Sequence, residues 1–212
     1  MEKISLLNFY KTAKETIIQM GYKQEIDYVE ERRFSDITAE IFQWEFVYVV
    51  LNSGMKNQVA EKIFQNYVKI GLDAVKHPLK KKAVAESEVK YKCWFRMLKD
   101  RKTDLERLEY LEALPHIGKV TKFHLARNIG LNVAKPDRHL SRIAEICGYV
   151  DVQLMCKELS EKTGARVGTV DVVLWRFCNL FPKQLESFEL CEKSCVGQGD
   201  YYCDEAICAF VS

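Results

Sequence analysis

The residues whose types and spacing could support chemistry gather in one stretch of the chain, residues 111–142. The carboxylate of Asp137 could stabilise positive charge that develops in a transition state, and it could orient or deprotonate an attacking water. The backbone amides around Gly118 lie at the predicted start of a helix, where amides and the helix dipole can grip a phosphate. Lys119 and Lys122 add positive charge beside them. The stretch therefore combines a phosphate-binding turn with one candidate catalytic carboxylate.

Local signals predict that these residues lie on a helix, a tight hairpin, a second helix, an extended segment and a third helix. The sequence Thr103–Glu106 has the capping-box pattern that opens a helix. Pro115 cannot continue that helix, and Gly130 suits a left-handed cap at the end of the second one. Pro136 favours an extended residue before it. Asp137 can then cap a third helix that ends near residue 148.

The run Leu114–Thr121, LPHIGKVT, resembles the hairpin LPGVGxKTA of the helix-hairpin-helix DNA glycosylases, the superfamily that includes endonuclease III. That family places an aspartate in a D-x-H context shortly after the second helix, and Asp137-Arg138-His139 stands there in this chain. The resemblance implies an all-α fold of two helical domains with a cleft between them. One domain would span 34–133 and contain the motif at about 104–129. The other would combine 1–33 with 134–212.

The resemblance further implies a base-excision-repair enzyme, a DNA N-glycosylase that flips a damaged or modified base out of duplex DNA and hydrolyses its N-glycosidic bond. Asp137 would be the catalytic residue. An alternative is that Asp137 only caps its helix, and the two roles are compatible. The residues expected to contact DNA are Gly118, Lys119, Val120, Thr121, Lys122, His139, Met55 and Asn57.

Met55 and Asn57 belong to a turn cluster at residues 52–57. In the family, the matching loop carries the side chain that enters the duplex when the target nucleotide leaves the stack. Met55 falls near that position, and a methionine can serve as a wedge, as in other proteins that kink DNA. The alternatives are that Met55 packs under its loop and that His139 only holds the turn at Asp137.

Two residues depart from the family pattern. Bifunctional members carry a lysine two residues after the second hairpin glycine, where it attacks the sugar through a Schiff base, and here Val120 stands at that position. A monofunctional hydrolytic enzyme is therefore favoured. The alternatives are a bifunctional glycosylase/AP lyase that uses Lys119 or Lys122, and a non-catalytic helix-hairpin-helix DNA-binding protein. His116 replaces the first hairpin glycine, which puts the hairpin geometry in question.

The cysteines near the C-terminus are candidate metal ligands. Many family members hold a [4Fe-4S] cluster through C-x6-C-x2-C-x5-C near the C-terminus, and four thiolates could also bind zinc. The four cysteines of the tail, spaced differently, are Cys191, Cys195, Cys203 and Cys208. Because the spacing departs from the family pattern, we assign no cofactor, and a [4Fe-4S] cluster or zinc bound by these four cysteines stays an alternative. Three further cysteines lie within helical patterns and are expected in the core: Cys93, Cys147 and Cys156.

Composition bounds the class of protein. The chain has 212 residues, 48% of them hydrophobic, and a net charge of +2, so a nucleic-acid footprint must be local. No run reaches the ~18 apolar residues of a membrane span, and no signal-peptide core appears near Met1. We therefore expect an intracellular protein, in the cytoplasm and nucleoid or in a nucleus, that does not act on a membrane. The resemblance implies that its partner is double-stranded DNA containing a damaged or modified base, and we expect it to be a monomer.

Hydrophobic periodicity predicts the remaining helices. Leu6, Phe9, Ala13 and Ile17 recur on one face of a first helix, which is followed by a polar connection to about residue 33. Further helices are expected from Ser35 or Asp36 to Leu51, over 58–75, up to Asp100, over 151–162 and over 169–180. The basic run at 76–82 is expected to be a solvated face, and the alternative is that it contacts DNA phosphates.

Overall fold

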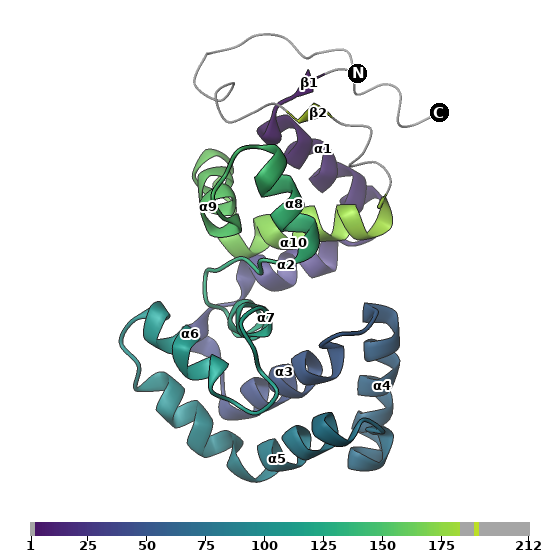
Figure 1. Ribbon diagram of the computed structural model, residues 1–212, viewed down its shortest axis with the longest axis vertical. Helices are drawn as coiled ribbons and strands as arrows, with labels where there is room; N and C mark the ends of the chain where they lie inside the picture. Colours follow the sequence, from purple (N-terminus) through teal and green to yellow (C-terminus); the bar gives the residue numbers. More distant parts are fainter. Residues whose placement is uncertain (1–2, 183–188, 191–212) are drawn as a thin grey trace. The chain divides into compact units, whose positions relative to one another are not determined.

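The computed structural model describes residues 3–182 and 189–190. Within these residues the chain forms ten α-helices, two 3₁₀-helices and one pair of two-residue strands (Figure 1). The helices and strands follow in this order: β1 (Lys3–Ile4), α1 (Leu6–Gln19), α2 (Lys23–Glu31), η1 (Phe34–Asp36), α3 (Ala39–Asn52), α4 (Asn57–Ile70), η2 (Gly71–Ala74), α5 (Pro78–Lys99), α6 (Asp104–Glu112), α7 (Thr121–Asn128), α8 (Arg138–Ile146), α9 (Val152–Thr163), α10 (Val167–Leu180) and β2 (Glu189–Leu190). The fold is therefore helical, as expected, apart from the short parallel pairing of β1 with β2.

The chain divides into two compact units, which are described separately. Of the described residues, unit 1 combines 3–31 with 133–182 and 189–190, and unit 2 spans Arg32–Asn132. The predicted domains, 34–133 and 1–33 with 134–212, and the cleft between them stay predictions.

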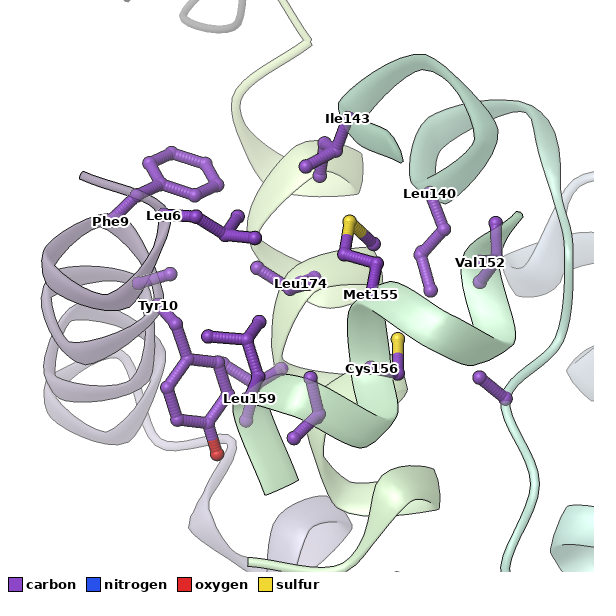
Figure 2. Close-up of a cluster of buried hydrophobic side chains, with 14 of the residues drawn as sticks. Leu6, Phe9, Tyr10, Leu140, Ile143, Val152, Met155, Cys156, Leu159 and Leu174 are labelled. Atoms are coloured by element: carbon purple, nitrogen blue, oxygen red, sulfur yellow. The ribbon is translucent and has the colours of Figure 1, made fainter. Parts of the chain in front are cut away.

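Unit 1 is built around α10, whose apolar side chains contact α1, α8 and α9. Figure 2 shows Leu174 of α10 among side chains from these three helices. The ring of Phe9 in α1 meets the ring of Phe177 in α10 edge to face, with centroids 5.4 Å apart. The labelled cluster consists of Leu6, Phe9, Tyr10, Leu140, Ile143, Val152, Met155, Cys156, Leu159 and Leu174. This core fixes the helix that Asp137 opens.

Unit 2 is built around α3, which packs against α4, α5 and α7 (Figure 1). Aromatic rings fill the contact between α3 and α5, where Phe46 lies 5.3 Å from Trp94 and Phe42 lies 5.6 Å from Phe95, centroid to centroid. The segment Phe46–Leu51 is helical rather than a strand, as expected from the lack of a pairing partner. The helix α7 of the hairpin motif packs on the same central helix.

Two expectations for the N-terminal part were wrong. The connection before residue 33 contains the helix α2, which buries only Ile26 and Val29 and so gives a weak periodic signal. It is held by α10, because Arg176 Nε donates to Glu25 Oε2 at 2.8 Å. The next helix begins at Ala39 rather than near residue 35, since Thr38 caps it and η1 occupies the preceding residues.

The boundaries of the later helices differ less from the predicted ones. The helix expected over 58–75 ends at Ile70, because Gly71 adopts φ +65° and the chain continues as η2. The helices α8, α9 and α10 agree with the predicted segments to within about two residues. Among the described residues, none of the helices is long and apolar enough to cross a membrane.

Candidate functional site

The hairpin between α6 and α7 has the local structure that the sequence predicts. Thr103 and Glu106 form the expected capping box at the start of α6. Leu114 and Ile117 are buried and anchor the turn that follows α6. His116 adopts φ +62°, a left-handed conformation that glycine adopts without strain. This conformation suits the glycine that the family pattern has at this position, and in this chain a histidine adopts it.

The second helix of the motif begins at Thr121, two residues later than expected. The Gly118 amide donates to Thr121 Oγ1 at 2.7 Å, and the Lys122 amide donates to the Gly118 carbonyl at 2.9 Å. Both amides are thus used within the hairpin. Those of Lys119, Val120 and Thr121 precede the first of these helical bonds, and they are the ones that can face an outside anion.

The hairpin lysines differ in their surroundings. Lys119 is exposed, whereas Lys122 forms an ion pair with Glu112 of α6 at 2.5 Å and its side chain is only 17% exposed. Lys122 therefore joins the two helices of the motif. Val120, at the position where bifunctional members carry lysine, is 41% exposed.

The turn between α3 and α4 is held by side-chain hydrogen bonds. Tyr48 Oη and Asn52 Nδ2 each donate to Asn57 Oδ1 at 2.8 Å. This occupies the acceptor oxygen of Asn57, so an outside partner of this side chain would meet its amide group. Met55, the expected wedge, is half-buried at the tip of the turn.

One lysine of the basic run 76–82 is not solvated, which corrects the expectation for that run. Lys80 is only 4% exposed, and its Nζ donates to the carbonyls of Leu51 at 2.8 Å and Ser53 at 2.6 Å. Desolvation lowers the pKa of Lys80 below its usual value. A run of lysines gives no sequence signal for which of them turns inward.

In unit 1, Asp137 caps α8 with one of its two carboxylate oxygens. Asp137 Oδ1 accepts hydrogen bonds from the amides of His139 at 2.9 Å and Leu140 at 3.1 Å. Neither bond uses Oδ2, so capping leaves one oxygen of the carboxylate available for another role. The structural and catalytic roles foreseen for Asp137 are therefore compatible in this geometry.

The extended segment before Asp137 is fastened to two other helices, which sequence reasoning missed. The Lys135 amide donates to Asp171 Oδ2 of α10 at 2.7 Å, and Asp171 is only 1% exposed. The Ala134 amide donates to Gln153 Oε1 of α9 at 3.0 Å, and Gln153 Nε2 donates back to the Ala134 carbonyl. These bonds orient the entry to α8. In the sequence, the one indication of these contacts is an aspartate inside the otherwise apolar pattern of α10.

Burial, and after it the charges around Asp137, shift the pKa values of two neighbouring residues. Burial lowers the pKa of His139, with Arg138 and Arg142 acting in the same direction and the Asp137 carboxylate opposing them. The ring of His139 is therefore mostly neutral at pH 7. Burial, and then the Asp137 carboxylate, raise the pKa of the Cys178 thiol to about 12. Cys178 is thus an inert core thiol rather than a nucleophile.

Three of the described cysteines are buried, Cys147, Cys156 and Cys178, while Cys93 is exposed on α5, contrary to expectation. No cluster of three or more potential metal ligands occurs in the described part of the chain. The tail cysteines considered for a cluster or zinc, Cys191, Cys195, Cys203 and Cys208, lie outside the described residues.

The arrangement of helices resembles that of two solved proteins. One is the Methanocaldococcus jannaschii 8-oxoguanine glycosylase/lyase, crystallised with DNA containing 8-oxoguanine, with a TM-score of 0.63 and 15% identity over 80% of this chain and 95% of that chain. The other is the 8-oxoguanine DNA glycosylase of Thermotoga maritima, with a TM-score of 0.62 and 16% identity over 80% of this chain and 94% of that chain. No protein-family model and no curated protein matches by sequence. The chain has the fold of the helix-hairpin-helix DNA glycosylases.

Proposed function

We propose that this protein is a monofunctional DNA glycosylase that removes a damaged or modified base from double-stranded DNA. The proposal depends above all on Asp137, whose carboxylate opens α8 and caps it through Oδ1 alone. The glycosylase fold, and the neighbour crystallised with DNA containing a damaged base, support DNA as the partner.

The proposed reaction is hydrolysis of the bond between the base and deoxyribose. As the base leaves with the bonding electrons, positive charge develops on the sugar, and a carboxylate held beside it stabilises that charge. Asp137 would supply the negative charge, orient the water that adds to the sugar carbon and take a proton from that water, while the departing base anion takes up a proton from solvent. The hairpin would hold the DNA through the backbone amides of Lys119, Val120 and Thr121, while Met55 fills the space left in the duplex.

A second candidate is a bifunctional glycosylase/lyase, because the Methanocaldococcus jannaschii neighbour is described in those terms. In this chain Val120 replaces the expected nucleophile, and Lys122 is paired with Glu112. Lys119 is exposed but lies one residue before that position, and both residues precede the start of α7 at Thr121. These observations favour the monofunctional reaction.

The test is a panel of duplex oligonucleotides, each with one lesion, beginning with 8-oxoguanine because both solved neighbours are 8-oxoguanine glycosylases. Each reaction is divided and analysed with and without hot alkali. Strand cleavage only after alkali supports a monofunctional glycosylase and identifies the base. Cleavage without alkali, together with a covalent adduct trapped by borohydride, would support the lyase. Binding without any base release would favour a DNA-binding protein.

A further inference from the structure

His116, in the left-handed position of the hairpin, contacts a segment 63 residues earlier in the chain. Its Nε2 lies 3.1 Å from Ser53 Oγ, in the turn that carries Met55. A residue other than glycine at φ +62° costs about 1 kcal/mol, and such strained positions point to a specific role when the surroundings hold them in place. The hydrogen bond to Ser53 is a contact that glycine at this position could not make.

The direction of this hydrogen bond follows from its neighbours. Ser53 Oγ donates its proton to the carbonyl of Val50 at 2.8 Å, so toward His116 it acts as an acceptor and Nε2 carries the hydrogen. Desolvation of the ring, then the charge of Lys80 and then His77 lower the pKa of His116. The ring is therefore a neutral donor at pH 7.

Ser53 is itself held firmly. The buried ammonium of Lys80 binds the carbonyls of Leu51 and Ser53 at the end of α3. At the other end of the turn, Tyr48 holds Asn57 at the start of α4. The turn is thus held at both ends by contacts that do not involve His116. The hydrogen bond from His116 therefore joins the hairpin to a segment that is already fixed.

We propose that His116 is a positioning residue that fixes the hairpin relative to the turn carrying Met55. The hairpin amides that bind phosphate and the side chain of Met55 would then contact the DNA at a fixed separation. Binding depends on this separation only when a nucleotide has left the base stack, because only then does Met55 enter the duplex. This inference rests on the proposed function. It predicts that losing the bond weakens binding to an opened duplex and spares binding to an intact one.

The test compares affinities for two duplexes, one intact and one with a tetrahydrofuran abasic site that mimics the duplex after base extrusion. Ser53→Ala and His116→Gly should each lower affinity for the abasic duplex about three- to tenfold, the loss expected for one hydrogen bond. Binding to the intact duplex should change less than about twofold, because it uses only the phosphate grip. Ser53→Thr keeps the hydroxyl and should retain wild-type selectivity.

The double variant Ser53→Ala/His116→Gly should be no weaker than either single variant, because both remove the same bond. Ser35→Ala, which removes an exposed hydroxyl elsewhere in unit 2, is the matched control, and thermal midpoints establish that all variants fold. Unchanged selectivity in the single variants, or losses that add in the double variant, would overturn the positioning role alone. A wild-type protein that does not prefer the abasic duplex would overturn the proposed function and this inference with it.

Discussion

Substitutions at Asp137 should separate its structural role from its catalytic one. Asn and Ser are as good as Asp at a helix N-cap, so Asp137→Asn should keep the bonds from the His139 and Leu140 amides. Alanine accepts neither bond, and losing such a cap costs about 1 kcal/mol. For a protein of this size that corresponds to a fall in Tm of about 2 to 4 °C. We therefore expect Asp137→Asn to melt near wild type and Asp137→Ala to melt measurably lower.

Catalysis should respond differently. Neither variant has a carboxylate to stabilise the charged sugar or take a proton from water. Both should lose base release by about 10²- to 10⁴-fold, the range for general acid–base groups. The assay is single-turnover release of the base identified in the lesion panel, with enzyme in excess, alongside affinity for the abasic duplex. That affinity should fall little in Asp137→Asn, because the hairpin contacts remain.

Asp151 provides a control, because it also caps a helix, α9, where its side chain accepts from the Leu154 amide at 2.8 Å. Asp151→Ala should lower Tm about as much as Asp137→Ala and leave base release near wild type. Wild-type release by Asp137→Asn would show that the carboxylate is not catalytic. An equal loss of rate in Asp151→Ala would show that the effect of Asp137→Ala is one of stability.

Three further predictions follow from other contacts. Gly118→Ala should leave Tm unchanged, because an added Cβ meets no atom nearer than 3.9 Å, yet it should weaken DNA binding in a fluorescence titration; unaltered affinity would mean that DNA does not approach this backbone. Asp171→Ala removes the acceptor of the Lys135 amide, so it should slow base release about 10- to 100-fold in a single-turnover assay and leave DNA affinity unchanged. A parallel loss of DNA affinity would point to general unfolding. Gly130→Ala should lower Tm by much more than Gly54→Ala. Both glycines have positive φ, but only at Gly130 would the added Cβ lie 2.5 Å from a backbone atom, the carbonyl carbon of Arg33. Equal melting temperatures for the two variants would contradict this packing.

Much of the hairpin motif and of the cap at Asp137 could be predicted, because the relevant bonds are local. The capping box at Thr103 joins residues three apart, and Asp137 caps amides two and three residues later. Such contacts join residues that lie two or three positions apart, so a short stretch of sequence is enough to predict them. The helix α2 was missed for the opposite reason, since its stability comes from α10 through Arg176 and Glu25.

The supports of the candidate site could not be predicted, because they join distant residues. Asp171 meets Lys135 across 36 residues, and His116 meets Ser53 across 63. The burial of Lys80 depends on carbonyls at the end of α3, which a run of lysines does not reveal. Local sequence thus indicates which groups could react, while tertiary packing decides how firmly they are held.

The order of the chain has a consequence for synthesis. The helix α1 leaves the ribosome early, but its packing partner α10 follows roughly 150 residues later, a wait of about 8 to 30 s at typical elongation rates. Unit 2, which is continuous in sequence, is synthesised completely during that interval. The apolar face of α1 stays unpartnered by α10 until then. Nascent chains halted before α10 should therefore expose the apolar face of α1, which is the form that a chaperone would encounter.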